Sequence, residues 1–207
     1  VETNYLAHSK IAVDSIGNVY FQQTLNTAGY AQFNFGNITK SANGAYGFLA
    51  KIDGNGTWQW VKATPGEQGT YSVTVDKNDN IWINSLEFQS SQNNRQFIQK
   101  YDSNGNILVT KEFAINGRAQ IYSMDTDSLS NLYFAGYFDT SFTETINGIS
   151  TNFQSSVDSD IIIGKYDSNG NLLWLKTPEV SNSASRAFDI EIYNDDEIYI
   201  TGEFYSQ

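Results

Sequence analysis

The sequence has no cysteine, one histidine, one methionine and two prolines among its 207 residues. Without cysteine, disulfides, zinc–thiolate centres and thiol catalysis are excluded. Basic residues are also scarce, because 12 Lys and Arg stand against 23 Asp and Glu and give a formal net charge of −11. That balance argues against the clustered positive surface that nucleic acids require. No apolar run approaches the roughly 18 residues of a membrane-spanning helix. We therefore expect no nucleic-acid partner, no membrane span and no cofactor.

What the chain does contain is an internal repeat. The peptide YDSNGN occupies residues 101–106 and returns at 166–171, with a looser copy at 52–57. A second element reads VDSIGNVY in its first copy. We call the residue at the position of its Asp the marker; it is Asp14, Asp76, Asp127 and, in a degraded fourth copy, Tyr193. The markers give repeats of 62, 51 and 66 residues. Self-similarity at this scale is typical of solenoids, arrays and propellers.

Each complete repeat predicts four short antiparallel strands. Apolar and aromatic residues alternate with period two and are bounded by Asn, Asp, Gly and Ser, and no stretch carries a sustained apolar stripe at helical spacing. Four-stranded units of roughly 50 residues repeated about an axis are propeller blades. We therefore predict an all-β chain forming one partial β-propeller over 1–207, with about three and a half blades. Its repeats lie at approximately 10–64, 70–114, 119–178 and 186–207, the last one incomplete.

The repeats differ in length mainly between the second and third strands. That connection should emerge on one rim, where loops carry specificity. Because closed propellers generally need four to eight blades, we expect this segment to be completed by further chain or by association.

These motifs, taken together, resemble a bacterial β-propeller repeat family, the SBBP repeats. The resemblance rests on VDSIGNVY at 13–20, KYDSNGNLLWLK at 165–176 and IYITG at 198–202. Gln23 and Ser85 depart from the pattern, since they stand where Gly136 and Gly202 occur, and Tyr193 replaces the marker Asp. The resemblance implies a module of secreted or surface-anchored bacterial proteins, often found beside adhesion or carbohydrate-binding modules, with no shared catalytic residues.

The sequence does not support a calcium site or a catalytic site. The spacing of Asp102, Asn104 and Asn106 suggests a calcium loop, but the twelfth position of an EF-hand loop needs a bidentate Glu and here holds Phe113. The hairpin-turn interpretation accounts for the same residues. His8, the single histidine, has no identifiable catalytic partners, and the acidic run 195–197 is typical of a solvated turn. We expect no catalytic residue and no metal site.

The tryptophans are predicted to pack in the core rather than bind a ligand. Trp82 shares its repeat position with Tyr20, Tyr133 and Tyr199, and positions that are bulky in every blade are where blades meet. Trp60 and Trp174 also share one position. Trp58, two residues before Trp60, is expected on the same face of its strand.

The long connections supply the candidate contact residues. Tyr30 and Phe33 in the first repeat, and Phe142 and Phe153 in the third, are not shared by every repeat and are predicted to contact a partner. The alternative is that FGNIT at 35–39 and INGIS at 146–150 mark hairpins that fold these apolar residues back onto the blade.

The sequence thus predicts a non-catalytic binding or scaffold module of an exported or cell-surface bacterial protein. Its partner would be a protein or a carbohydrate at the cell surface, contacted through rim loops. Two alternatives stay open: a glycan-acting hydrolase or lyase with acids at the propeller axis, and a protein-binding adhesin repeat.

Overall fold

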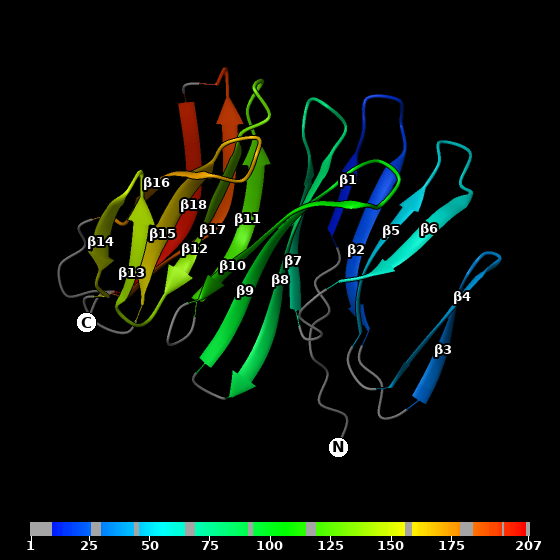
Figure 1. Cartoon of the computed structure of the whole chain (residues 1–207), viewed down its shortest axis with the longest axis horizontal. Helices are drawn as coiled ribbons and strands as arrows, with labels where there is room; N and C mark the ends of the chain where they lie inside the picture. Colours follow the sequence, from blue (N-terminus) through cyan, green and yellow to red (C-terminus); the bar gives the residue numbers. More distant parts are fainter. Residues whose placement is uncertain are drawn as a thin grey trace.

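The computed structural model describes residues 10–25, 30–43, 46–64, 69–90, 93–114, 119–155, 159–178, 184–195 and 197–205. These residues form eighteen β-strands and no helix (Figure 1). Accordingly, no helix that could cross a membrane occurs in this part of the chain. The predicted all-β class is confirmed.

Three four-stranded antiparallel sheets follow one another along the chain, each with the same strand order. The first contains β1 (Lys10–Val13), β2 (Val19–Leu25), β5 (Tyr46–Ile52) and β6 (Trp58–Ala63). The second contains β7 (Gly69–Val75), β8 (Ile81–Ser90), β9 (Asn93–Tyr101) and β10 (Ile107–Ala114). The third contains β11 (Ala119–Thr126), β12 (Leu132–Phe138), β15 (Asp160–Tyr166) and β16 (Leu172–Lys176). A fourth sheet has two strands, β17 (Ala184–Tyr193) and β18 (Glu197–Tyr205).

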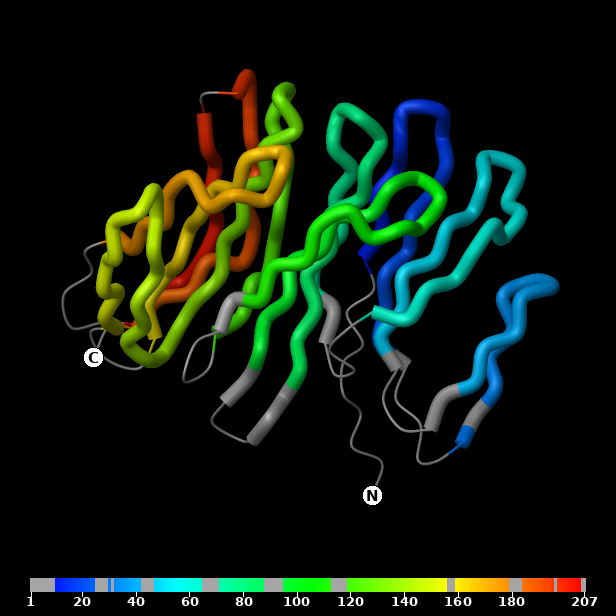
Figure 2. The backbone as a smooth tube through the Cα atoms, viewed as in Figure 1, coloured from blue at the N-terminus to red at the C-terminus, as the bar shows by residue number. Residues whose placement is uncertain are grey.

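Two extra hairpins account for the length differences between repeats. The hairpin β3 (Tyr30–Phe35) and β4 (Ile38–Asn43) lies between β2 and β5, and β13 (Phe142–Ile146) and β14 (Ile149–Phe153) lie between β12 and β15. Figure 2 shows them at opposite ends of the row of sheets. In the second sheet the connection is short, and β8 and β9 are lengthened instead. The predicted location of the length variation is confirmed.

The sheets lie side by side through their first strands, β1, β7, β11 and β17. Strand β7 contacts both β1 and β11, and β11 contacts β17, although each belongs to a different sheet. Side chains bridge these strands: Ser72 Oγ accepts a hydrogen bond from Met124 N at 3.0 Å, and Asp125 Oδ2 accepts one from Ile192 N at 2.8 Å. In Figure 1 the turns that join β1 to β2, β7 to β8 and β11 to β12 lie along the same, upper edge of the row.

The apolar core sits between successive sheets. Tyr20 and Leu49 of the first sheet pack with Val73 and Ile81 of the second. The second and third sheets, and the third and fourth, are joined by similar clusters. Three members of the shared aromatic position are almost fully buried, Tyr20 and Trp82 at 0% exposed and Tyr133 at 3%. The prediction that this position packs between sheets is confirmed for them, whereas Tyr199 on β18 is 59% exposed.

One prediction about the tryptophans is wrong. Trp58 and Trp60 do not share a face of β6, because the pairing of β5 with β6 shifts register between Lys51 and Ile52. Trp60 packs between the first and second sheets, where its indole Nε1 donates to the carbonyl of Ser103 at 3.2 Å. Trp58 instead packs against Phe35 of the inserted hairpin, with ring centroids 5.1 Å apart. A β-bulge changes which residues alternate on a face.

Six turns share one hydrogen-bond pattern centred on an aspartate. In the Asp127 turn, Oδ1 accepts from the backbone N of Leu129 and of Asn131, and Oδ2 accepts from Asn131 Nδ2. The carboxylate thus satisfies the turn's own donors, as expected for Asp in such loops. Equivalent turns begin at Asp14, Asp76, Asp102 and Asp167, and also at Asp53, where Oδ2 accepts from Gln59 Nε2 instead.

The lysine that directly precedes each YDSNGN peptide, Lys100 or Lys165, contacts the marker aspartate of its sheet. Lys100 Nζ lies 2.9 Å from Asp76 Oδ2, and Lys165 Nζ lies 3.1 Å from Asp127 Oδ2, with both pairs largely buried. Lys100 also donates to the carbonyl of Ser168, in the turn of the next sheet, at 2.9 Å. The lysine before the YDSNGN turn and the marker aspartate therefore contact each other within a sheet, and Lys100 also joins two neighbouring sheets.

Hydrogen bonding lowers the pKa of four of the turn aspartates. Burial alone would raise the pKa of Asp127, but hydrogen bonds from the side chain and backbone of Asn131 and the nearby Lys165 ammonium outweigh it. The same opposition of burial and hydrogen bonds lowers the pKa of Asp14, Asp102 and Asp167.

We expect acid to destabilise the fold through these groups. A carboxyl whose folded pKa is depressed contributes stability above the unfolded pKa of about 4, and loses it as pH falls through the folded value. Urea unfolding of the wild type and Asp127→Asn should therefore show a large difference near neutral pH that shrinks below about pH 4. A difference that stays constant across this range would contradict the assignment.

Equivalent glycines provide a test of how the sheets pack. Gly56 and Gly170 occupy the same turn position with φ of 83° and 80°. A Cβ on Gly170 would lie 2.5 Å from Val109 Cγ1 of the preceding sheet, whereas a Cβ on Gly56 meets nothing within 4 Å. Gly56→Ala should cost about 1–2 kcal/mol for its left-handed backbone. Gly170→Ala should cost a further 1–3 kcal/mol, roughly, for overpacking. Equal losses in chemical denaturation would contradict this packing.

Candidate functional site: an aromatic cluster on the first strands

The predicted contact residues of the first inserted hairpin differ in exposure. Tyr30 is 70% exposed, and its hydroxyl donates to Ser41 Oγ at 3.0 Å and accepts from Gln32 Nε2 at 3.3 Å. Phe33 is half-buried against the cluster that holds Phe35. The exposed ring of Tyr30 is therefore accessible to a partner, whereas the half-buried ring of Phe33 is less accessible.

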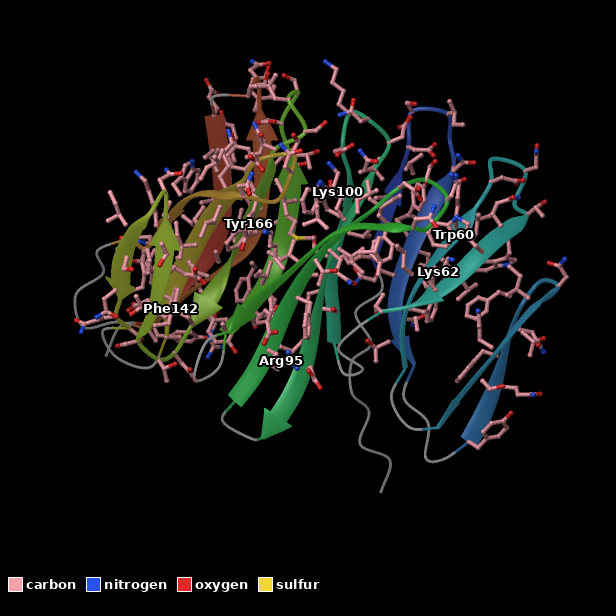
Figure 3. The ribbon with its side chains drawn as sticks, viewed as in Figure 1. Trp60, Lys62, Arg95, Lys100, Phe142 and Tyr166 are labelled. Carbon is pink, nitrogen blue, oxygen red and sulfur yellow. The ribbon has the colours of Figure 1, made fainter. Side chains whose placement is uncertain are left out.

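The predicted contact residues of the second inserted hairpin are buried. Phe142 and Phe153 are 7% and 8% exposed and stack on each other with centroids 5.1 Å apart. Phe142 also packs edge-on against Phe138 of β12 at 5.1 Å. Figure 3 shows Phe142 on this hairpin, at the end of the molecule away from Trp60. The alternative given above, a hairpin folded back onto its sheet, accounts for both residues and leaves them little surface for a partner.

The acidic residues considered for chemistry have structural contacts. Asp195 Oδ1 accepts a hydrogen bond from Ser128 N at 2.7 Å, which ties the turn of the fourth sheet to that of the third. Asp102 accepts hydrogen bonds from the backbone N of both Asn104 and Asn106, as the other turn aspartates do from theirs. Within the described ranges no three His, Asp or Glu side chains are grouped to hold a metal ion. His8 and Asp196 lie outside the described residues.

A feature not foreseen from the sequence is a bulge near the start of three first strands. The pairing register shifts between Thr70 and Val73 on β7, between Ile121 and Ser123 on β11, and between Ala187 and Asp189 on β17. Each shift leaves an aromatic residue at the bulge, five positions before the marker of its repeat; these residues are Tyr71, Tyr122 and Phe188.

Glycine opposite the bulge is required in two of the sheets. A Cβ on Gly136 would lie 1.9 Å from the backbone oxygen of Gln120, and one on Gly202 would lie 2.3 Å from the backbone oxygen of Arg186. Both contacts are with backbone, so no side-chain rearrangement relieves them. The glycine of the repeat pattern therefore admits the bulged backbone that carries the aromatic ring.

The bulge residues meet to form one aromatic cluster, which we define as Tyr71, Tyr122, Tyr137 and Phe188. Tyr122 is at its centre, with ring centroids 5.9 Å from Tyr71, 5.8 Å from Tyr137 and 5.5 Å from Phe188. Tilted and edge-to-face arrangements at these distances are favourable. The cluster therefore extends across the second, third and fourth sheets.

Polar groups border the cluster on the fourth sheet. The Arg186 guanidinium lies over the Tyr137 ring at 4.9 Å and near the Tyr205 ring at 6.0 Å. Glu203 is paired with Arg186 across β17 and β18, with Nη1 and Oε1 4.0 Å apart, and it accepts a hydrogen bond from the Tyr205 hydroxyl. Ring faces, donors and acceptors thus occur together at this position.

Burial raises the pKa of the central tyrosine. The pKa of Tyr122 is about 12, because burial and the neighbouring Tyr137 disfavour the phenolate. Burial also raises the pKa of Tyr71, although a hydrogen bond with the Gln120 side chain opposes the effect. Both hydroxyls are therefore neutral hydrogen-bonding groups at physiological pH.

Comparisons with known proteins give the fold alone. No family model matches the sequence, and no curated protein matches it. Among solved structures, the chain is similar to a protein of unknown function from Bacteroides caccae, with 12% sequence identity and a TM-score of 0.53. The match covers 97% of this chain and 54% of that one, so the chain spans about half its length.

The burial of the second hairpin yields a stability prediction. Phe142→Ala should destabilise the protein by about 3–5 kcal/mol, because it removes a buried stacked ring and leaves a cavity. Tyr30→Ala, an aromatic deletion at an exposed hairpin position, should change stability by less than about 0.5 kcal/mol. Urea denaturation of both variants measures the contrast, and comparable losses would show that Phe142 does not anchor its hairpin.

Proposed function

We propose that the chain is a segment of a β-propeller of the SBBP-like type, in which the four sheets are successive blades. Three observations support this: the constant strand order, the adjacent first strands and the apolar clusters between sheets. Polar links between neighbouring turns support it further. Ser15 Oγ donates to Asp79 Oδ2 at 2.7 Å, and Asn78 Nδ2 donates to Ser130 Oγ at 2.9 Å.

The fourth blade would be completed by strands pairing with β18, supplied by further chain or by an associating chain. The counterparts of Tyr199 are covered by the next sheet and also by a fourth strand of their own sheet, as Tyr20 is by Trp60 and Tyr133 by Trp174. The exposure of Tyr199 therefore supports further strands beyond β18. A crystal structure of the complete protein in which β18 remains at a sheet edge would contradict it.

The function we propose is that of a non-catalytic binding module on a rigid scaffold, in an exported or cell-surface bacterial protein. The observation that carries the binding role is the aromatic cluster, because equivalent positions of three sheets bring partly exposed rings together. A rigid array presents such rings without an ordering cost on binding. Carboxylates on the first strands support a structural role for the acids, since Asp125 and Asp189 each accept a hydrogen bond from a neighbouring first strand.

An array that carries both glycans and extracellular proteins tests this function. We expect saturable binding to at least one class, weakened about fivefold by Phe188→Ala, because one aromatic contact contributes about 1 kcal/mol. Tyr30→Ala serves as the matched control, an exposed aromatic on a different element, and should bind as the wild type does. Absence of binding to either class, or release of a cleaved product, would overturn the proposal.

A further inference from the structure

Where one sheet is followed by a four-stranded sheet, side chains of the first donate to a turn of the second. Lys51 Nζ and Trp60 Nε1 of the first sheet both lie 3.2 Å from the backbone oxygen of Ser103, in the turn that joins β9 to β10. Lys100 Nζ of the second sheet lies 2.9 Å from the backbone oxygen of Ser168, in the turn that joins β15 to β16. The acceptor is the same in both cases, the serine carbonyl of a YDSNGN turn.

The glycine of the same turn packs against the last strand of the preceding sheet. A Cβ on Gly105 would lie 3.2 Å from the Trp60 ring, and one on Gly170 would lie 2.5 Å from Val109 Cγ1. Trp60 and Val109 occupy one repeat position, on β6 and β10. The turn glycine of the first sheet, Gly56, meets nothing within 4 Å. The close fit of this turn therefore comes from the sheet before it.

The third sheet carries the same donors toward the fourth. Lys165 and Trp174 stand at the repeat positions of the lysines and the tryptophan described above. Trp174 packs with the cluster that contains Ile192 and Ile200 of the fourth sheet, and Trp60 packs with the equivalent residues of the second. The third and fourth sheets therefore meet as the first and second do, as far as the second strand of each later sheet.

Both donors have capacity for a turn carbonyl. Lys165 Nζ contacts the Asp127 carboxylate and donates to the Tyr133 hydroxyl, which leaves a third N–H of the ammonium unused. The indole of Trp174 contacts the Tyr133 ring, with centroids 6.0 Å apart, and its Nε1 donates to no described residue. In the first two sheets the corresponding groups are bonded to the next sheet, so these two are the members of the series without that acceptor among the described residues.

From these equivalences we propose that Lys165 and Trp174 form a binding site for the turn of a β-hairpin of the chain's own repeat type. The hairpin supplies the third and fourth strands of the fourth sheet, and its first strand pairs with β18. The carbonyl at the serine position of its turn accepts hydrogen bonds from Lys165 Nζ and Trp174 Nε1, and its glycine packs against Trp174. Its second strand covers Tyr199. This inference rests on the proposal that the sheets are successive blades, and it identifies the partner of β18 by the chemistry of its turn.

A second copy of the chain does not present a turn at this place. The turn at 53–56 belongs to a sheet whose own first two strands would overlap β17 and β18. If two copies paired antiparallel through β18, the partner's β17–β18 turn would lie at the opposite end of the sheet from Lys165 and Trp174, because turns between antiparallel strands alternate between the two ends. A hairpin that carries only the third and fourth strands meets neither obstacle.

The test is an NMR titration of the isotope-labelled full chain with an unlabelled synthetic peptide. The peptide has the sequence of residues 159–178, which contains β15 and β16, with lysines added at both ends for solubility. We expect the indole N–H signal of Trp174 to shift downfield and to saturate, because this group gains an acceptor. The signal of Trp60, which already donates to Ser103, should stay in place. Trp174→Phe identifies the shifted signal by removing it.

Variants of the peptide and of the chain assign the contacts. A peptide carrying Gly170→Ala should bind at least about tenfold more weakly, because its Cβ overpacks against the third sheet, whereas one carrying Asn169→Ala should bind normally. In the chain, Trp174→Phe should weaken binding about fivefold, because the ring remains and the donor is lost. Trp60→Phe is the matched control: its site is occupied by the chain's own turn, so the affinity for the peptide should not change.

Several results would overturn the inference. A peptide that shifts the amide signals of β18 and leaves Trp174 unchanged would complete the sheet without using this site. Equal affinity for the Gly170→Ala peptide would show that the turn does not pack against the third sheet. The absence of any shift, or dimerisation of the chain through β18, would show that a hairpin of this type is not the partner. None of these results alters the array experiment, which tests the binding role of the aromatic cluster separately.

Discussion

Apolar contact between successive sheets is the interaction on which the rest of the structure depends. Each sheet is a single antiparallel layer, and its faces are buried where a neighbouring sheet or an inserted hairpin covers them. Val73 on β7 and Met124 on β11 are 8% and 5% exposed, whereas Ile11, at the equivalent position of β1, is 65% exposed. The difference arises from the neighbour and not from the residue, because all three are apolar and occupy the same repeat position. Stability in such an array is therefore a property of pairs of sheets.

The polar turns make this apolar stacking regular. An aspartate carboxylate satisfies the donors within each turn, which leaves other side chains free to bond to the next turn. Ser15 with Asp79 and Ser128 with Asp195 repeat one such contact between different pairs of sheets. Asp79 and Asp195 both adopt positive φ, 58° and 65°, a conformation that Asp tolerates better than most residues. Local turn chemistry and the spacing of the sheets are thus set by the same few side chains.

Much of the local structure followed from the sequence, because its causes are local. The YDSNGN and VDSIGNVY elements mark turns through Asp, Asn and Gly, and the period-two runs beside them became strands. The position of the inserted hairpins followed from comparing distances between repeats. Whether the sheets surround a common axis stays a prediction, as does the SBBP resemblance.

The candidate site was harder to foresee, because it depends on bulges and on contacts between distant residues. The period of two along a strand predicts that Trp58 and Trp60 share a face, but one register shift places their side chains on different faces. Tyr71, Tyr122 and Phe188 lie 51 and 66 residues apart, and their proximity follows only from the stacking of first strands. Their common spacing before the marker was a usable signal. Phe142 was predicted to contact a partner because its insert is not shared by every repeat. An insert that differs between repeats can still be buried, and Phe142 packs against its own sheet.

The position opposite each bulge, glycine in two sheets and serine in one, has an evolutionary consequence. Ser85 occupies the position of Gly136 and Gly202 in the second sheet, and there the register shift spans a longer stretch, from Thr70 to Val73. Tyr71 still reaches Tyr122 there, with ring centroids 5.9 Å apart, so the sheet with serine keeps the bulge and its ring and differs in how far the pairing is interrupted. Duplicated units of this kind can therefore vary one at a time in the detail of this strand, without redesigning the framework they share.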